Sequence, residues 1–549
     1  MIYDNLVNLE VLFTSPYISC SKHTTIITSS INSSSLMMDV MYDGALLRPQ
    51  QASYSGFIIN HNKSNMISLL LCWVSLVLLM LTISAAEQVP HMEMTALSAL
   101  HKSTGGDTWR WQDERVAGAV WNFTLDSAGQ FADNPCSSSA TANQTWQGVK
   151  CSQIPHVCSS QVCHIIDINL RLYGLSGPIP DDIRNLTFLS SLRLDRNQLS
   201  GLIPSEIGQL LALSHLDLDH NLLTGTIPNE LGNLIKALYI GANYMTGTIP
   251  SEIGELTSLE VLYLYGNDLT GTIPAAIGQL TNLIVFGFNE NQLTGTIPPE
   301  LGQLTLCWGF DIDRNQLTGS IPDEVGQLVA LEQLALNSNQ LTGTIPSQLW
   351  QLTTLKQLSL RSNQLTGTIP SDIGQLTILE LLFLYSNQLT ASIPAEMGDL
   401  TALALLSIHS NQLTEPIPDE MGQLSALEMF YVYSNMLTGT LPATIGYLQN
   451  TDELWLQDNY LVGTLPSEMS SMRKLRSIFL QNNILTGHLD DAFNHSIQKE
   501  LMSIDLSNNR LSGSLWAEMF LLPQLKVLAL SGAYAYLTPI SPQCVCLIL

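Results

Sequence analysis

Basic residues are scarce in this chain. Lys and Arg number 21 against 47 Asp and Glu in 549 residues, and the formal net charge is −26. Nucleic acids and anionic lipid surfaces are bound through clustered Lys and Arg side chains, so this balance argues against both as partners. A strongly acidic surface keeps a protein soluble and favours cationic partners.

Sequence signatures of catalysis are also missing. The chain has no Gly-rich phosphate-binding loop and no kinase signature set. The one cluster of suitable side chains is His215, Asp217, Asp219 and His220. A divalent metal could bind there, but charge pairing between neighbouring strands is the interpretation we favour. We therefore expect no enzyme activity, no metal and no cofactor.

Long hydrophobic runs are limited to one segment, Ile67–Ala86. Its 20 uncharged residues are enough to span a bilayer, and its last small residues suit signal-peptidase cleavage. It is either a signal peptide, used from a start at Met41 or Met66, or an uncleaved signal-anchor that is the chain's one membrane contact. Residues 1–66 are rich in Ser, Thr and Asn, which predicts a disordered or mis-annotated N-terminal extension.

Fourteen asparagines recur at a nearly fixed interval, and eleven of the thirteen gaps between them are 24 residues. A fixed period of this size is typical of a solenoid with one supersecondary unit per repeat. These positions are Asn197, Asn221, Asn243, Asn267, Asn291, Asn315, Asn339, Asn363, Asn387, Asn411, Asn435, Asn459, Asn483 and Asn509.

Each repeat has the pattern of one short strand and one turn. Leu334 and Leu336 alternate with polar or small residues, as in a half-buried strand. Asn339 follows, and a buried Asn offers both amide donors and a carbonyl acceptor to turn backbone. Stacked one repeat apart, such residues form a ladder that satisfies buried backbone groups. Pro346 then stops the inward strand, and the next segment suits a helical or 3₁₀ turn.

This pattern resembles the plant-type leucine-rich repeat, LxxLxLxxNxLxGxIPxxLGxL, over residues 165–532. The resemblance implies an α/β solenoid: a right-handed superhelix of about 16 repeats of 24 residues. It implies a parallel concave β-sheet, with short helical or 3₁₀ turns on the convex side. Ala391 and Glu415 depart from the pattern, because the family has Gly at these positions.

Residues 87–164 resemble the N-terminal cap of this family. Met92–Lys102 has the pattern of a short amphipathic helix, and Trp146 to Cys151 reads W-x-G-V-x-C. A solenoid needs such a cap to cover the open end of its core. The resemblance pairs Cys136 with Cys151 and leaves Cys158 and Cys163 as a second pair, although spacing alone permits other connectivities. Residues 533–549 read as a degenerate C-terminal tail.

Four N-x-S/T sequons follow the apolar segment, at Asn122, Asn143, Asn185 and Asn494. Each is a glycosylation acceptor if the chain enters the secretory pathway. Sequons also occur by chance, so they support an extracellular location without establishing it.

Aromatic residues gather at positions that the repeat predicts on the concave face. The larger set, which we name the aromatic ladder, spans five consecutive turns; a second set, the tyrosine patch, is smaller. Aromatic side chains on a curved sheet suit a protein or peptide ligand or a sugar ring, whereas strands also favour aromatics that merely pack on one another. We favour binding for the ladder and packing for the patch. The ladder is Phe383, Tyr385, His409, Tyr431, Tyr433, Trp455 and Phe479, and the patch is Tyr239, Tyr263 and Tyr265.

A Thr-Gly-Thr triplet recurs in many repeats, for example at Thr342–Thr344. Both Thr side chains should face outward, and stacking gives a grid with spacings of about 4.8 Å and about 6.7 Å. Such a grid resembles surfaces that bind ice or crystalline polysaccharide. Thr is also simply a good strand former.

These observations predict an extracellular leucine-rich repeat protein that recognises a protein, peptide or glycan through its concave face in signalling or defence. The alternatives are an ice- or polysaccharide-surface binder and an inhibitor of secreted wall-degrading enzymes. We expect a secreted protein or a signal-anchored cell-surface protein with a membrane receptor as a possible partner. Fold alone does not identify the ligand.

Overall fold

The structure is a computed structural model. It describes residues 89–111, 120–127, 130–131, 135–136, 146–152, 163–231, 235–489, 492–512, 521–532 and the backbone of 546–548. All of them belong to the unit Leu78–Leu549. The predictions for residues 1–66 and 67–86, and those for Asn143 and Cys158, lie outside the described residues.

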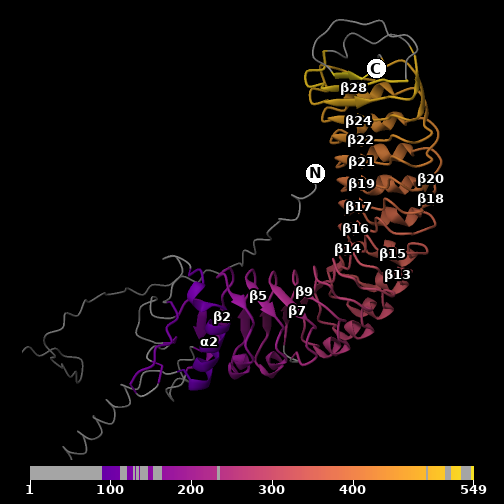
Figure 1. Cartoon of the computed structure of the whole chain (residues 1–549). Coiled ribbons are helices and arrows are strands. Elements are labelled where there is room, and N and C mark those ends of the chain that lie inside the picture. The colour runs from indigo at the N-terminus through magenta and orange to yellow at the C-terminus, as the bar shows by residue number, and fades with distance from the viewer. Residues whose placement is uncertain are drawn as a thin grey trace, which may run out of the picture. The chain divides into compact units, whose positions relative to one another are not determined.

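The repeats build one 18-stranded sheet on the concave side of the array (Figure 1). β1 pairs antiparallel with β2, and the later neighbours pair in parallel with equivalent residues side by side. The strands are β1 Val149–Cys151, β2 Ile165–Asn169, β4 Ser191–Arg193, β6 His215–Asp217, β8 Ala237–Tyr239, β10 Val261–Tyr263, β11 Val285–Gly287, β12 Gly309–Asp311, β14 Gln333–Ala335, β16 Gln357–Ser359, β17 Leu381–Phe383, β19 Leu405–Ser407, β21 Met429–Tyr431, β22 Glu453–Trp455, β24 Ser477–Phe479, β26 Ser503–Asp505, β28 Val527–Ala529 and β29 Cys546–Ile548.

The predicted asparagine ladder is present and explains why the turns after the strands can be buried. Asn339 donates from Nδ2 to the carbonyls of Ile312 and Leu336, at 3.1 and 3.2 Å. Its Oδ1 accepts a hydrogen bond from the backbone N–H of Leu317, at 3.0 Å. One side chain therefore joins two successive repeats, and it satisfies the N–H of Leu317, which would otherwise be buried unpaired.

Further strands follow the ladder asparagines on the side of the array and form small parallel sheets of their own. The glycines here have positive φ, as at Gly343 (φ 77°), and Ala391 and Glu415 are held in the same left-handed region, at 66° and 64°. The side strands are β3 Ser176–Gly177, β5 Gln198–Gly201, β7 Leu222–Gly225, β9 Tyr244–Met245, β13 Thr318–Gly319, β15 Gln340–Leu341, β18 Thr390–Ala391, β20 Gln412–Leu413, β23 Val462–Gly463, β25 Ile484–Gly487 and β27 Arg510–Leu511.

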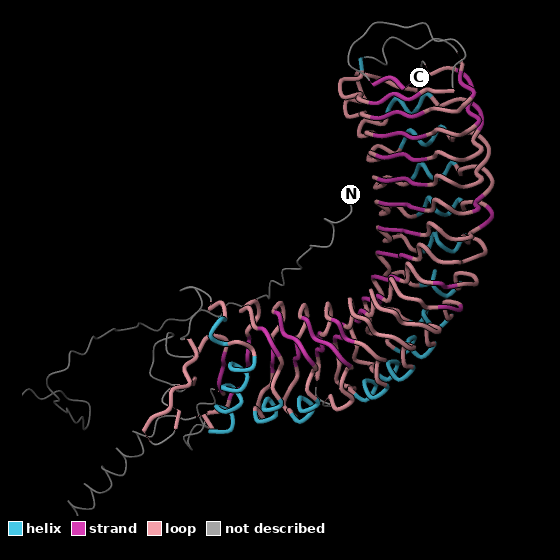
Figure 2. The backbone as a smooth tube through the Cα atoms, viewed as in Figure 1, coloured by secondary structure: helices cyan, strands magenta, loops and turns pink. Residues whose placement is uncertain are grey.

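3₁₀ turns occupy the convex side, as Figure 2 shows. In the repeats each begins directly after the proline of the Ile-Pro or Leu-Pro pair, and the buried Leu and Ile side chains between turns and sheet form one continuous core. The turns are η3 Asp181–Asn185, η4 Ser205–Gln209, η5 Ser251–Glu255, η6 Ala275–Gln279, η7 Pro299–Gln303, η8 Asp323–Gln327, η9 Ser347–Gln351, η10 Ser371–Gln375, η11 Ala395–Asp399, η12 Asp419–Gln423, η13 Ala443–Tyr447 and η14 Ser467–Ser471.

The cap covers the first repeat with helix α2 (His91–Ser103) and the 3₁₀ turn η1 (Gly106–Thr108). Leu97 and Leu100 of α2 are fully buried in the common core. Glu93, also buried, accepts a hydrogen bond from the backbone N–H of Ile165 at 2.8 Å, which fastens α2 to β2.

A disulfide joins Cys136 to Cys151, with their Cα atoms 5.7 Å apart. This is the pairing that the resemblance implies. The proposed partner of Cys163 lies outside the described residues, so the second pair stays a prediction.

The sheet extends by one strand past residue 532, because β29 pairs with β28. The boundary of the repeats at residue 532 stays a prediction. Among the residues that the structure describes, no helix is both long and apolar enough to cross a membrane.

Candidate functional site

The aromatic ladder comes together on the concave sheet because the repeats are in register. Residues four before each ladder asparagine form one column, in which Phe383, Tyr431, Trp455 and Phe479 occupy equivalent positions of β17, β21, β22 and β24. Ser407 of β19 separates the first two. A second column, two residues before each asparagine, holds the remaining members of the ladder.

Three rings of that second column form a nearly parallel stack. His409 lies between Tyr385 and Tyr433, with ring centroids 4.2 and 4.0 Å apart and interplanar angles of 17° and 10°. The Tyr433 hydroxyl lies 3.2 Å from His409 Nε2, and Ser410 Oγ lies 3.0 Å from Nδ1. Burial lowers the pKa of His409 to about 4. The stack is therefore uncharged near neutral pH.

Trp455 joins the two columns at the C-terminal end of the ladder. Its ring centroid lies 4.6 Å from that of Tyr431, 5.4 Å from Phe479 and 6.0 Å from Tyr433. Aromatic pairs at such separations stabilise one another beyond their buried area, so the ladder is a preformed surface.

Tyr431 corrects the expectation that every ladder member is exposed. Its side chain is only 7% exposed, because Trp455 packs against its ring and its hydroxyl donates to the carboxylate of Glu453. Tyr431 packs against the ring of Trp455 and offers little surface to a ligand.

Arg361 belongs to the same site and was not predicted. Its guanidinium carbon lies 5.8 Å from the ring centroid of Phe383 and 5.4 Å from that of Tyr385. Its Nη1 donates a hydrogen bond to the Tyr385 hydroxyl. Cation–π contact holds the guanidinium against these rings. The signal was in the sequence, since Arg361 stands two residues before Asn363, in the column of Tyr385.

The tyrosine patch packs mainly on itself and on neighbouring carboxyls, as expected. Tyr239 and Tyr263 have ring centroids 5.6 Å apart, and the Tyr265 hydroxyl donates to Asp219 Oδ2 at 3.1 Å. Burial raises the pKa of Tyr263 to about 12.

The His215–His220 cluster consists of two exposed histidines and two half-buried carboxyls, Asp217 on β6 and Asp219 in the turn after it. Burial raises the pKa of Asp217 to about 7 and that of Asp219 to about 6, and in Asp217 the nearby Asp195 and Asp219 carboxyls raise it further. Charge pairing between neighbouring turns occurs at Asp195, whose carboxylate lies 3.2 Å from Arg171 Nε. The described residues contain no group of three or more His, Cys, Asp or Glu side chains placed to hold a metal.

The Thr-Gly-Thr array is exposed and regular, but its groups have internal contacts. Thr294 Oγ1 donates to the carbonyl of Gly271 in the preceding repeat at 3.2 Å, and equivalent Thr residues make the same bond elsewhere in the array. A Cβ on Gly295 would lie 2.7 Å from the Thr272 methyl group. Part of the Thr pattern therefore has a packing explanation.

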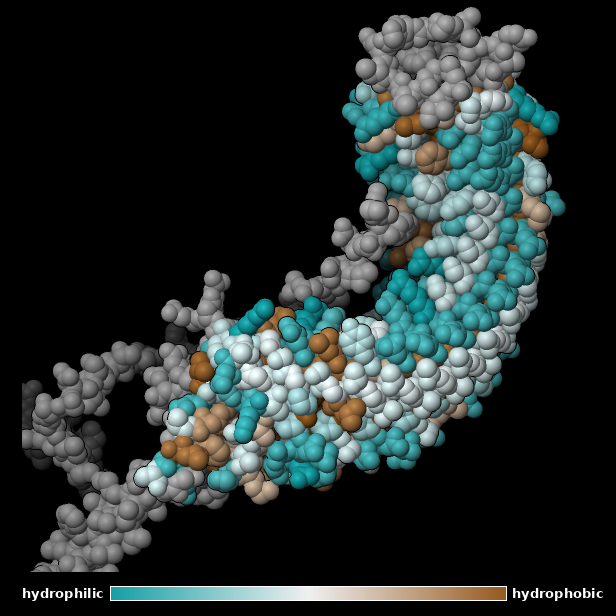
Figure 3. All heavy atoms as spheres, viewed as in Figure 1, coloured by the Kyte–Doolittle hydropathy of each residue, from teal (hydrophilic) through white to brown (hydrophobic). Residues whose placement is uncertain are grey.

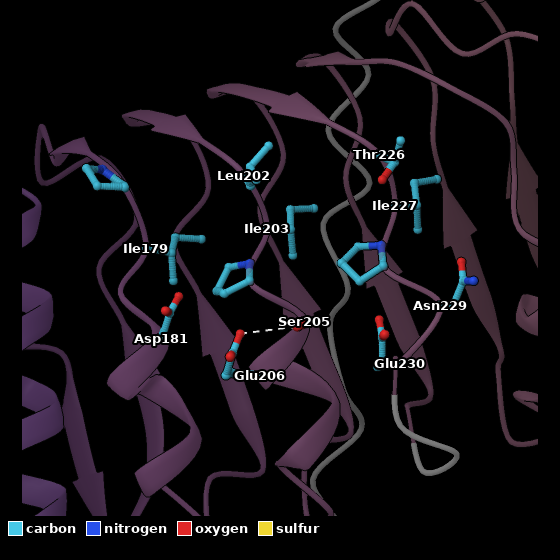
Figure 4. A pocket seen from close by; sticks show the side chains of 13 residues that line it. Ile179, Asp181, Leu202, Ile203, Ser205, Glu206, Thr226, Ile227, Asn229 and Glu230 are labelled. Atoms are coloured by element: carbon cyan, nitrogen blue, oxygen red, sulfur yellow. Dashed lines mark hydrogen bonds between the residues drawn. The ribbon is translucent and has the colours of Figure 1, made fainter.

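A separate groove of about 610 Å³ lies beside the N-terminal repeats (Figure 4). Isoleucines of three successive repeats line it with three carboxylates, and Ser205 donates to Glu206 at 3.3 Å. Leu202 lines the groove at a position where most repeats have Thr, and its side chain is 63% exposed. Figure 3 shows hydrophobic side chains scattered over these repeats. The groove was not predicted, and it shares no residue with the aromatic ladder.

Two of the predicted glycosylation acceptors have the same local geometry. Asn122 Oδ1 accepts a hydrogen bond from the N–H of Thr124 at 3.2 Å, and Asn494 Oδ1 accepts one from Ser496 at 2.9 Å. Asn185 ends the turn η3. Glycosylation of these residues stays a prediction.

Comparison with known proteins supports the repeat assignment. A family model described as Leucine Rich Repeat matches residues 188–210, 212–234, 258–280, 330–352 and 354–376. The plant peptide hormone receptor RGFR1, solved in complex with RGF2, is 35% identical with a TM-score of 0.60, over 65% of this chain and 61% of that one. A TDR receptor is 33% identical with a TM-score of 0.61, over 67% of this chain and 68% of that one.

A probable leucine-rich repeat receptor-like serine/threonine-protein kinase of Arabidopsis thaliana is 32% identical over 78 residues. That match covers 14% of this chain and 7% of the kinase. The chain thus spans a small part of that kinase and less than two thirds of the RGFR1 chain. This chain belongs to the leucine-rich repeat family, and the solved structures similar to it include the plant peptide hormone receptor RGFR1 and a TDR receptor.

Proposed function

We propose that this chain is an extracellular ligand-binding leucine-rich repeat protein that binds a peptide through the aromatic ladder. The observation that carries the proposal is the preformed, uncharged stack of Tyr385, His409 and Tyr433, continued by Trp455 and Phe479 on one face. Aromatic residues of this kind supply most of the binding energy at protein and peptide interfaces.

The relatives support a peptide rather than another ligand, because RGFR1 is described as a plant peptide hormone receptor in complex with RGF2. The same relationship supports an extracellular or cell-surface location. Protein and glycan ligands, and a role as an inhibitor of wall-degrading enzymes, are the alternatives that the experiment below must separate from a peptide. That the chain has no enzyme activity stays a prediction.

The size of the ladder sets the size of the ligand. From Tyr385 to Phe479 the ladder crosses five strands, which is about 19 Å at ~4.8 Å per strand. An extended peptide covers this distance with roughly six residues at ~3.3 Å each. A seven-residue peptide is therefore a suitable probe.

A displayed library of random seven-residue peptides, panned against the secreted product of the full chain, tests the proposal. We expect sequences to be enriched, and we expect the double variant Tyr385→Ala/Tyr433→Ala to bind them at least tenfold more weakly. Tyr239→Ala/Tyr263→Ala in the tyrosine patch is the matched control and should stay within twofold. Equal loss in both variants, or none in either, would show that the ladder is not the binding site.

The regular Thr grid favours a second candidate function, binding to ice or crystalline polysaccharide. It is tested by ice recrystallisation in the presence of the purified protein, and by pull-down on crystalline cellulose. Activity at micromolar concentration that Thr344→Val/Thr366→Val removes would establish it; inactivity in both assays would end it.

A further inference from the structure

Three buried polar atoms at the C-terminal end of the aromatic ladder have no hydrogen-bond partner among the residues that the structure describes. They are Nε1 of Trp455 and the Oε1 atoms of Gln457 and Gln481. A buried polar atom without a partner destabilises the folded chain, and most buried polar atoms in proteins have one. Three together on adjacent repeats leave this end of the ladder with polar groups that a ligand can satisfy.

These side chains are neighbours on the concave face. Gln457 follows Trp455 by two residues and points to the same side of the sheet. Gln481 occupies the position of Gln457 in the next repeat, and its backbone carbonyl accepts a hydrogen bond from Asp458 at 2.9 Å. The three atoms thus lie on two adjacent repeats, directly beyond the stack of Tyr385, His409 and Tyr433.

Residues next to these three side chains on the concave face have paired polar groups. Tyr433 and His409 contact each other through Oη and Nε2. In the next column, one residue before each ladder asparagine, Asn482 donates to Asp458 at 2.6 Å and Asn508 donates to Asn482 at 2.7 Å. In the column that runs from Tyr385 to Gln481, the unpaired atoms are thus those of Gln457 and Gln481.

The chemistry of the three atoms matches a peptide main chain. An indole N–H donates to a carbonyl, and two amide carbonyls accept from N–H groups. None is charged, so an isolated carboxylate or ammonium would gain no opposite charge here. A sugar ring would need an open face of Trp455, but the rings of Tyr431 and Phe479 pack at 4.6 and 5.4 Å from it. The terminal torsion of Gln is soft, so a small rotation turns each carbonyl toward a ligand.

We propose that Trp455, Gln457 and Gln481 bind the main chain of an extended peptide whose side chains contact the aromatic ladder. The proposal rests on the function proposed above. It makes this end of the site tolerant of peptide sequence, whereas the ladder selects for side chains.

The double variant Gln457→Met/Gln481→Met tests the proposal, because Met keeps the length of Gln and removes the carbonyl. With a seven-residue peptide selected on the unaltered protein, we expect affinity to fall at least tenfold while the melting temperature stays equal or rises. Gln333→Met/Gln357→Met, a register pair on the same sheet outside the site, is the matched control and should change affinity less than twofold. A variant that binds as tightly as the unaltered protein overturns the proposal.

Backbone N-methylation of the selected peptide gives a second readout. Replacing each N–H in turn should weaken binding tenfold or more at one or two positions, and those positions should lose their sensitivity in Gln457→Met/Gln481→Met. Binding that is insensitive to N-methylation everywhere overturns the main-chain assignment while leaving the ladder as the site. A library that yields no binder contradicts the proposed function itself and this inference with it.

Discussion

At the scale of single residues, the ladder asparagines show what the sequence predicts well. Their spacing and amide chemistry predict buried turns, and Asn339 makes the expected bonds to two repeats. Tyr431 shows what it predicts poorly. Its burial depends on the ring of Trp455, which is 24 residues away, and on a hydrogen bond to Glu453. Position in a repeat fixes which face a side chain points to, whereas its exposure depends on how large the neighbouring residues are.

Replacing one ladder asparagine should destabilise the array strongly. Asn339→Ala leaves the N–H of Leu317 unpaired in a buried turn and removes one of the two hydrogen bonds that the carbonyls of Ile312 and Leu336 each accept. We expect a loss of about 3 kcal/mol in the free energy of unfolding. Gln340→Ala, next to it and exposed, should cost under about 0.5 kcal/mol. Denaturant unfolding measures the stability of both variants. Equal effects would contradict the stabilising role of the ladder asparagines.

Asp217 should make the protein less stable at high pH. Its pKa is about 7 in the folded chain, against about 4 in an unfolded one. The folded chain therefore keeps a proton that the unfolded chain has lost, so the stability that this proton provides is present below pH 4 and is lost as the pH rises through 7.

Asp217→Asn mimics the protonated side chain. It should raise the free energy of unfolding at pH 8 by on the order of 2 kcal/mol and change little at pH 4. The exposed Asp268→Asn serves as control, with little effect at either pH. A gain of equal size at both pH values would count against the protonation argument.

At the scale of the element, the side strand explains why Gly and Thr recur together. Gly367 has a φ of 84°, and a Cβ there would lie 2.8 Å from the Thr344 methyl group; at Gly343, where the preceding repeat has Ser320, the nearest atom would be 3.4 Å away. The sequence predicted that both Thr residues face outward, but it could not separate a binding grid from packing. That distinction needs the contacts between repeats.

Ala391 and Glu415 should be destabilising in their present positions. Both stand where the pattern has Gly and have left-handed backbone, which costs about 1 kcal/mol for a residue with a side chain. Glu415→Gly should therefore stabilise the array by about 1 kcal/mol, despite the extra entropy of an unfolded Gly.

In the opposite direction, Gly367→Ala should destabilise the array more than Gly343→Ala, because only the Cβ at position 367 also meets a methyl group. Melting temperatures of the three variants decide this.

At the scale of the whole molecule, the fixed period made the architecture predictable. One strand per repeat in parallel register, 3₁₀ turns on the convex side and a capping helix were all confirmed. Strand β29 was not predicted, because Cys546–Ile548 lies outside the 24-residue period of the repeats. The groove beside the N-terminal repeats was not predicted either; Pro178 and Leu202 line it at the repeat position where Thr226 and most later repeats have Thr.

Passage through the secretory pathway is a prediction for the chain as a whole. Expressed in a eukaryotic secretory host with a C-terminal tag, the product should carry N-glycans at Asn122, Asn143, Asn185 and Asn494, detected by mass after glycosidase treatment. A mature N-terminus near Glu87 would identify a secreted protein, and retention of residues 1–86 at the cell surface would identify a signal-anchored one. An unglycosylated product that stays inside the cell would contradict an extracellular function.

The most direct test of the central claim is to locate a bound peptide by photo-crosslinking. A selected seven-residue peptide that carries a photoreactive residue is irradiated with the protein, and mass spectrometry identifies the attached residues. The account predicts crosslinks on the concave face between Arg361 and Gln481, reduced by Tyr385→Ala/Tyr433→Ala. Crosslinks on the Thr grid, on the convex turns or in the groove beside Leu202 would contradict it.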